Sequence, residues 1–163
     1  MTFAVIASEA KQSIPPRRQY GLLRRFAPRN DGEKPGTLMI DHVSVGVSNL
    51  ERSARFYEST LAPLGLSRLV TRPATIGFGK TYPEFWINLR AGMAKVSPES
   101  GTHICLRAKA TGDVDAFHAA ALSAGGRSDG APGIRPHDRV KYYAAFVIDP
   151  DGNRIEAVTF PSE

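Results

Sequence analysis

The chain has 163 residues, of which 42% are hydrophobic and 23% are charged. This composition excludes general disorder, and the length suits one ordinary domain with a tail. The single cysteine, Cys105, excludes an internal disulfide and a zinc site built from several cysteines, which fits a reducing compartment. No apolar run has the length of a membrane helix, so we expect a cytoplasmic protein with no membrane partner.

The formal net charge of +5 is concentrated near the start of the chain. Residues 1–38 contain seven Lys and Arg against three Asp and Glu, whereas residues 39–163 contain fourteen against thirteen. Binding to a phosphate backbone needs basic residues on a folded face, so we expect no nucleic-acid partner. Prolines and glycines interrupt every apolar patch of residues 1–38, which predicts a basic, poorly ordered extension before a domain at 39–163. A translation start at Met39 and an organelle transit peptide are the alternative interpretations of this segment.

An internal repeat organises residues 39–161. The match appears when the residues around His42 are aligned with those around His103. Three further pairs then share the same offset from these histidines: Phe56 with Phe117, Leu61 with Leu122, and Gly65 with Gly126. Two copies of one unit, residues 39–98 and 99–161, explain the agreement.

Each unit is predicted to begin with a strand, because apolar and polar residues alternate over 42–47 and over 103–106. A helix follows in both units. Ser48 or Asn49 can cap the first helix, and Thr111 or Asp113 can cap the second. Glycines at 65 and 125–126 end the two helices.

Extended runs follow each helix. The first unit offers them at 67–70, 75–79 and 84–89, and the second has a clear hairpin of 142–148 and 154–159 around a turn at 149–152. We interpret the segment GAPGIRPHDRVK, residues 130–141, as a loop over the opening of a concave surface. The sequence therefore predicts an α+β fold with the order strand, helix and about three strands, used twice.

Three potential metal ligands occupy corresponding places in this scheme. Alternation along the strands sends His42, His103 and Glu156 to the face opposite the helices. Two imidazoles and one carboxylate suit a divalent ion such as Fe, Mn, Ni or Zn. We therefore predict a metal site of these three residues, with ordinary solvated polar side chains as the alternative.

Further polar and aromatic residues are predicted near this site. Arg90 and Arg107 could hold a carboxylate or phosphate of a substrate, with strand-end arginines reaching solvent as the alternative. A histidine can carry protons and a tyrosine can donate to a developing oxyanion, so we assign catalytic roles to His137 and Tyr143 beside Glu156. The remaining candidates for substrate contact are Trp86, Asn88 and Tyr142. Cys105 is interpreted as a small buried packing residue.

Three segments carry a family resemblance: IDHVSVGVSNLERSARFYESTLAPLGL, GTHICL and AAFVIDPDGNRIEAV. Together they resemble the vicinal oxygen chelate superfamily, which includes glyoxalase I, bleomycin-resistance proteins and extradiol dioxygenases. The resemblance spans Met39 to about Pro161. It implies two βαβββ modules that form an open, U-shaped β-barrel, and it places His42, His103 and Glu156 at metal-ligand positions.

Two departures from the family pattern bear on activity. Asn88 stands where glyoxalase I-like members carry a fourth ligand, and Phe146 stands where extradiol dioxygenases carry a tyrosine. We expect a metal-dependent lyase, isomerase or dioxygenase that binds a small-molecule substrate through vicinal oxygens and stabilises an enolate-type intermediate. The alternative is a metal-free protein that sequesters a small molecule, as bleomycin-resistance members do, and Asn88 favours it. An exposed sheet edge in each module predicts a homodimer.

Overall fold

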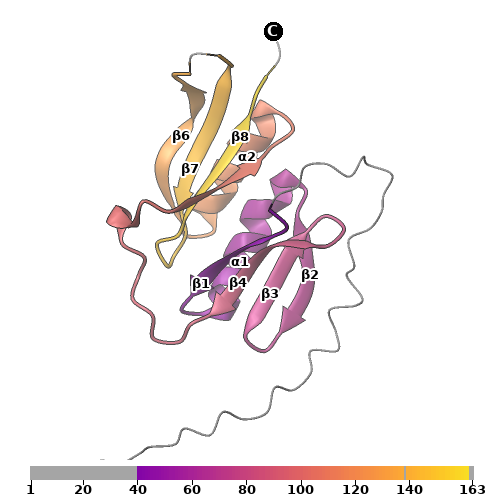
Figure 1. The fold of residues 1–163 in the computed structure, drawn as a ribbon, viewed down its shortest axis with the longest axis vertical. Helices are drawn as coiled ribbons and strands as arrows, with labels where there is room; N and C mark the ends of the chain where they lie inside the picture. The colour runs from indigo at the N-terminus through magenta and orange to yellow at the C-terminus, as the bar shows by residue number, and fades with distance from the viewer. Residues whose placement is uncertain (1–39, 138, 162–163) are drawn as a thin grey trace, which may run out of the picture. The chain divides into compact units, whose positions relative to one another are not determined.

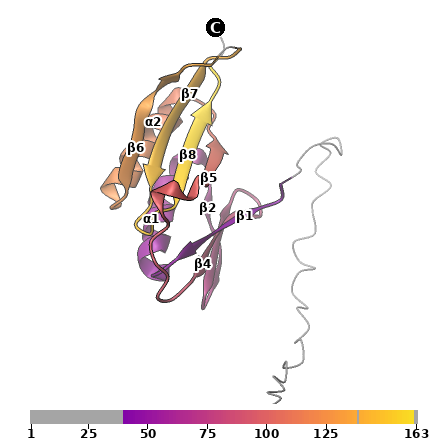
Figure 2. The same ribbon diagram turned by 60° about the vertical axis from the view of Figure 1, so that its left-hand side comes forward.

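The computed structural model describes residues 40–137 and 139–161, and within them the chain folds as two βαβββ modules (Figures 1 and 2). The sheets of the two modules are separate and not closed, and the α+β class and the repeated order of elements agree with the prediction. The predicted extension at residues 1–38 lies outside the described residues. Neither long helix within the described ranges has the length and apolar character needed to cross a membrane.

The first module contains one helix and a four-stranded sheet. Its elements are β1 (Val43–Val47), α1 (Leu50–Leu61), β2 (Ser67–Arg72), β3 (Thr75–Gly79) and β4 (Pro83–Leu89). The strand order is β1-β4-β3-β2, with β1 parallel to β4 and the other pairs antiparallel. Asn49 caps α1 by accepting a 2.9 Å hydrogen bond from the backbone N–H of Arg52, as one of the two predicted caps.

The second module repeats this plan. Its elements are β5 (His103–Arg107), α2 (Thr111–Ser123), β6 (Arg127–Arg135), β7 (Tyr142–Ile148) and β8 (Arg154–Thr159), in the strand order β5-β8-β7-β6. A residue within the first turn of α2 stabilises its start. The Asp113 carboxylate accepts hydrogen bonds from the backbone N–H groups of Lys109 and Ala110 at 3.2 and 3.1 Å. Ala110, not Thr111 or Asp113, therefore occupies the capping position.

The strand β6 corrects the interpretation of residues 130–141 as a loop. Residues up to Arg135 belong to β6 and pair with β7. The pairing is irregular between Ser128 and Gly130 and again between Gly130 and Gly133. Because an edge strand with bulges tolerates a residue that lacks a backbone N–H, Pro132 fits here. Glycine and proline, normally signs of a turn, thus mark a bulged edge strand.

One hydrophobic core serves both modules. Its cluster includes Phe56 and Tyr57 of α1 and Phe117 of α2, together with apolar residues from the helix-facing sides of both sheets. The Tyr57 ring lies 5.0 Å from the Phe56 ring and 4.9 Å from the Phe85 ring, measured between centroids. Such aromatic packing adds to the stability gained from burial alone.

Two glycines at equal offsets in the repeat have different tasks. Gly65 follows the short 3-10 turn Ala62–Leu64 and has a φ of 80°, the left-handed region that favours glycine. Gly126 permits a close approach instead: a Cβ there would lie 2.7 Å from Cε2 of Phe56 and 3.0 Å from the carbonyl oxygen of Ile148. The second module therefore packs directly against α1 at this point.

The turn between β7 and β8 links the modules through two buried carboxylates. Asp151 accepts hydrogen bonds from the Ser48 hydroxyl at 2.5 Å, from the Arg52 guanidinium at 2.6 Å and from the Ser53 hydroxyl at 3.1 Å. Asp149 accepts from the Tyr57 hydroxyl at 2.7 Å. We call these contacts the interlock, because a turn of the second module is bound by the start of the first module's helix.

Candidate functional site

Glu156 is the centre of a polar cluster on the open face of the second sheet, opposite α2. Ile104 and Leu106 of β5 pack against the core, so the alternate residues His103, Cys105 and Arg107 face the other way. Glu156 of β8 pairs with Cys105 across the sheet. Its carboxylate is only 2% exposed, whereas the His103 side chain is 50% exposed. The cluster thus places a buried acid beneath an accessible imidazole.

Both oxygens of Glu156 have partners. Nε2 of His103 lies 3.2 Å from Oε2, and the Tyr142 hydroxyl donates a short hydrogen bond to Oε1. Burial and this hydrogen bond raise the pKa of Tyr142. Burial and the neighbouring charge of Glu156 raise the pKa of Cys105 to about 12, although the thiol side chain is partly exposed. Both groups therefore keep their protons near neutral pH, and Tyr142 remains a donor to the Glu156 carboxyl group.

Aromatic rings and one guanidinium surround this carboxylate. The His137 ring stacks on Tyr142 at 5.9 Å, and Phe160 meets the edge of Tyr142 at 5.3 Å. The Arg107 guanidinium lies 4.2 Å above the Phe160 ring. Within the described ranges no carboxylate forms an ion pair with Arg107, and its guanidinium faces the open side of the sheet.

His42 belongs to the other module and lies apart from this cluster. It directly precedes β1, its side chain is 51% exposed, and its Nδ1 lies 2.7 Å from Oδ2 of Asp41. In the described part of the chain, no three His, Cys, Asp or Glu side chains are close enough to hold a metal ion. The structure therefore brings together two of the three predicted ligands, His103 and Glu156.

The pairing registers correct the position assigned to Asn88. Glu156 pairs with Cys105, which follows His103 by two residues. The corresponding residue of the first module is Ser44, and Ser44 pairs with Trp86. Trp86 is therefore the counterpart of Glu156, and Asn88, paired with Gly46, lies one step further along the strand. Counting residues from His42 and His103 does not identify Trp86 as the counterpart of Glu156, because the segments that connect the strands differ in length between the two modules.

Two other predicted residues, Tyr143 and Arg90, lie away from the cluster, and Cys105 differs from its predicted burial. Tyr143 packs on the core side of β7, and its hydroxyl donates a 2.7 Å hydrogen bond to Asp115 of α2. Arg90 donates to the backbone carbonyl of Leu89 at the end of β4. Cys105, expected to be a buried packing residue, is exposed on the face that carries His103. Tyr143 and Arg90 thus do not join the contacts around Glu156.

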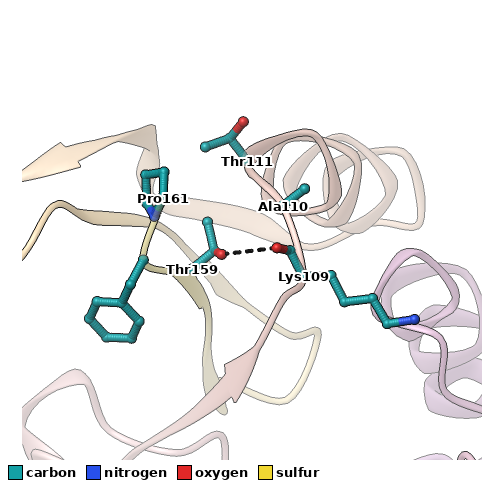
Figure 3. Close-up of a pocket in the computed structure, with 6 residues that line it drawn as sticks. Lys109, Ala110, Thr111, Thr159 and Pro161 are labelled. Carbon is teal, nitrogen blue, oxygen red and sulfur yellow. Dashed lines mark hydrogen bonds between the residues drawn. The ribbon is translucent and has the colours of Figure 1, made fainter. Parts of the chain in front are cut away.

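A cavity of about 290 Å³ lies beside the cluster, where β8 ends and α2 begins (Figure 3). Its lining residues are Lys109, Ala110, Thr111, Thr159, Phe160 and Pro161. The Thr159 hydroxyl donates to the carbonyl oxygen of Lys109 at 3.4 Å (Figure 3). The backbone N–H groups of Lys109 and Ala110 are already bonded to Asp113. The cavity meets the cluster around Glu156 only at Phe160.

The sequence interpretation missed two residues of these open faces, Phe160 and Arg72. Phe160 follows Glu156 by an even number of residues, so the alternation that placed Glu156 could have found it. Arg72 ends β2, and its guanidinium lies 5.5 Å from the Trp86 ring centroid. Arg72 and Trp86 are far apart in the sequence, and only the folded sheet brings them together.

Comparisons with known proteins agree with this architecture. The family model for the Glyoxalase/Bleomycin resistance protein/Dioxygenase superfamily matches residues 39–157. A glyoxalase/bleomycin resistance protein from Albidiferax ferrireducens T118 shares 33% sequence identity, covers 76% of this chain and 99% of its own, and has a TM-score of 0.67.

More distant structures share the fold. A glyoxalase-related enzyme from Fulvimarina pelagi is 22% identical, with 75% of this chain and 88% of its own covered and a TM-score of 0.56. A glyoxalase/bleomycin resistance protein/dioxygenase family enzyme from Burkholderia phytofirmans PsJN is 15% identical, with 73% and 96% covered and a TM-score of 0.53. A comparison with curated proteins gave no match. Because the family model spans most of the chain and the Albidiferax protein matches over nearly its whole length, this chain belongs to the Glyoxalase/Bleomycin resistance protein/Dioxygenase superfamily.

Proposed function

We propose that this protein is a divalent-metal-dependent enzyme whose metal site is shared between two copies of the chain. His103 and Glu156 of one copy and His42 of the other would be the ligands. The observation that carries the proposal is the 3.2 Å separation of Nε2 of His103 and Oε2 of Glu156. Two donor atoms bound to one ion at about 2.0–2.2 Å lie roughly 3 Å apart, and the separation of this pair is close to that value, which supports the proposal.

A second copy is proposed because each module leaves strand edges unpaired. Among the described residues, β1 pairs only with β4, and β5 pairs only with β8. Unpaired edges are where chains associate, and a twofold axis would let each copy offer its β1 edge to the other. His42, exposed beside β1, would then approach the accessible side of His103. The imidazoles and the carboxylate together form a donor set that suits Fe, Mn, Ni or Zn.

When bound, the ion would supply Lewis-acid chemistry to two adjacent oxygens of a substrate and favour an enolate-type anion, as in lyase, isomerase or dioxygenase reactions. The side chains of this protein have separate tasks. Tyr142 fixes the orientation of Glu156 by its hydrogen bond. His137, stacked on Tyr142, would exchange a proton with the substrate, and Arg107, over the Phe160 ring, would bind an anionic group.

A second candidate function is metal-free sequestration of a small molecule. Trp86 favours it, because an indole occupies the position that corresponds to the carboxylate of Glu156. An aromatic surface binds ligands by stacking and burial and contributes nothing to metal coordination. In this function the open faces of the sheets would again be the binding surface, and His103 and Glu156 would make polar contacts with the bound molecule.

Metal analysis distinguishes the two candidate functions. Protein purified without chelator should contain nearly one divalent ion per chain. His42→Ala and Glu156→Gln should both lose it, whereas Arg55→Gln, on the exposed surface of α1, should retain it. Wild-type protein that takes up no Mn, Fe, Ni or Zn on titration would favour the sequestration function instead.

A mixing experiment tests the sharing of the site between copies. His42→Ala and His103→Ala each destroy every site in a homodimer. In a mixed dimer one site keeps its ligands, so unfolding and refolding the two variants together should restore metal to about one quarter of the sites. If all ligands came from a single chain, mixing would restore none, and the proposal of a shared site would be wrong.

A further inference from the structure

The open face of the first sheet carries a flat aromatic surface. Trp86 of β4 pairs with Gly77 of β3, and a Cβ at Gly77 would lie 2.9 Å from Cζ3 and 3.0 Å from Cε3 of the indole. The benzo half of the ring therefore lies directly on the Gly77 backbone. Trp86 is absent from the described hydrophobic core, because its neighbours Phe85 and Ile87 take the core side of β4. One face of the indole is thus supported by the sheet and the other is turned away from it.

A positive charge lies over this ring. The Arg72 guanidinium carbon is 5.5 Å from the Trp86 ring centroid, within cation–π range but beyond the contact distance of about 3.5–4 Å. Arg72 is exposed, and no carboxylate of the described ranges forms an ion pair with it. Its N–H donors therefore remain available for an anionic group bound close to the indole.

His42 lies at the opposite corner of this sheet from Arg72. In the sheet order β1-β4-β3-β2 (Figure 1), His42 precedes one edge strand and Arg72 ends the other. Trp86 belongs to β4, which lies between the two edges. Adjacent strands are about 4.8 Å apart and each residue rises about 3.3 Å. The registers set Arg72 level with Asn88 and His42 one residue before the level of Phe85, so His42 and Arg72 are separated by roughly 20 Å along the diagonal of the sheet. One substituted ring does not span this diagonal, so the contacts available to a ring on Trp86 are those of Arg72, whose guanidinium carbon is 5.5 Å from the indole centroid.

We propose that this face binds a planar aromatic carboxylate, with the ring stacked on Trp86 and the carboxylate bound by Arg72. A flat ring matches the indole because aromatic faces stack in offset pairs, and a guanidinium binds a carboxylate through two parallel hydrogen bonds. The inference rests on the proposed function only in assigning this face to the same site as the metal. It makes Trp86 and Arg72 the residues that determine the substrate class.

Nuclear magnetic resonance tests the stacking. Trp86 is the single tryptophan of the chain, so isotope-labelled protein gives one indole N–H signal. The probes are benzoate, its saturated counterpart cyclohexanecarboxylate and its neutral counterpart benzamide, each titrated into metal-free protein. Benzoate should shift the indole signal saturably, with an affinity about tenfold higher than that of either counterpart. Equal affinities for benzoate and cyclohexanecarboxylate, or no saturable shift with benzoate, would overturn the inference.

A matched pair of variants tests the charge. Arg72→Gln should weaken benzoate binding about tenfold and leave benzamide binding unchanged. Arg55→Gln, which removes another exposed arginine, on the outer surface of α1, should change neither. Both variants retain Trp86 and hence the signal. Unchanged benzoate binding in Arg72→Gln would exclude Arg72 as the anion-binding residue.

Metal titration of the same samples separates this inference from the proposed function. His103→Ala should lose metal binding and keep the benzoate shift, because it lies on the other module. A normal benzoate response in protein that binds no metal would uphold the aromatic site and contradict the metal enzyme. Normal metal binding without a benzoate response would contradict the aromatic site alone.

Discussion

The Tyr57 hydroxyl donates a 2.7 Å hydrogen bond to Oδ2 of Asp149, and both side chains are buried. Burial, followed by the charge of Asp149, raises the pKa of Tyr57 well above its ordinary value, so the phenol remains a donor. Tyr57→Phe should lower the free energy of unfolding by about 1–3 kcal/mol, because a buried carboxylate loses a partner. Urea unfolding measures the loss. Tyr143→Phe is the control: its bond to Asp115 is exposed, so a loss as large as that of Tyr57→Phe would contradict the assigned role of burial.

Acid should weaken the interlock at Asp151. Burial raises the pKa of Asp151, but hydrogen bonds from Ser48 and Arg52 outweigh it, so the pKa is lowered overall. A carboxyl with a lowered pKa in the folded state stabilises the protein above its unfolded value of 3.8, and this contribution is lost as the pH falls further.

Asp151→Asn tests this dependence on pH. The variant should be less stable than the wild type above pH 3.8, and the difference should shrink below it. Urea unfolding at a series of pH values measures both proteins. Asp149, whose pKa is raised by burial, gives the opposite dependence of stability on pH in both the wild type and Asp151→Asn. The difference in unfolding free energy between the two proteins therefore reports on Asp151. A difference that does not change with pH would show that the Asp151 charge contributes nothing.

Gly126→Ala should destabilise the protein by about 1–3 kcal/mol, since the added methyl group collides with the Phe56 ring and with backbone oxygens. Gly112→Ala provides the matched control within α2. A Cβ at Gly112 meets no atom within 4 Å, and alanine favours a helix over glycine by up to about 1 kcal/mol. Thermal unfolding of both variants should therefore give shifts of opposite sign. A neutral Gly126→Ala would mean that the two modules can move apart at little cost.

Tyr142→Phe should weaken metal binding about tenfold or more without preventing it, given the proposed metal site. The hydroxyl holds Oε1 of Glu156, and groups that orient a ligand typically contribute 10- to 100-fold in affinity. Titration with Mn or Zn against a competing chelator measures the change. Tyr143→Phe should bind metal as the wild type does, because that tyrosine faces the core. Equal affinities for Tyr142→Phe and wild type would remove Tyr142 from the site.

Local patterns were sufficient for most elements of the fold. Alternation located β7 and β8, and a cap with a later glycine located α1, because these signals depend only on neighbouring residues. The strand β6 was not predicted from the sequence, because its glycines and Pro132 are typical of a turn. Its strand structure depends on pairing with β7. Pairing partners are set by the folded sheet and are not visible in the local sequence.

The candidate site shows the same division. Glu156 and His103 could be predicted because each lies on a strand whose alternation is clear. The counterpart of Glu156 could not be found by counting along the chain, since only the register of β1 with β4 identifies Trp86. The place of His42 could not be predicted either, because a residue at an unpaired edge can take its partners from another chain.

The interlock makes the two halves of the duplication unequal. Both buried acids belong to the turn after β7, while residues 80–82, in the corresponding turn after β3, contain neither an aspartate nor a glutamate. Two copies of the first half could not reproduce these bonds, since neither copy would supply an acceptor for Ser48, Arg52 or Tyr57. The two halves therefore share the same path of the chain, but the hydrogen bonds that hold them together depend on Asp149 and Asp151, which have no counterpart in the first half.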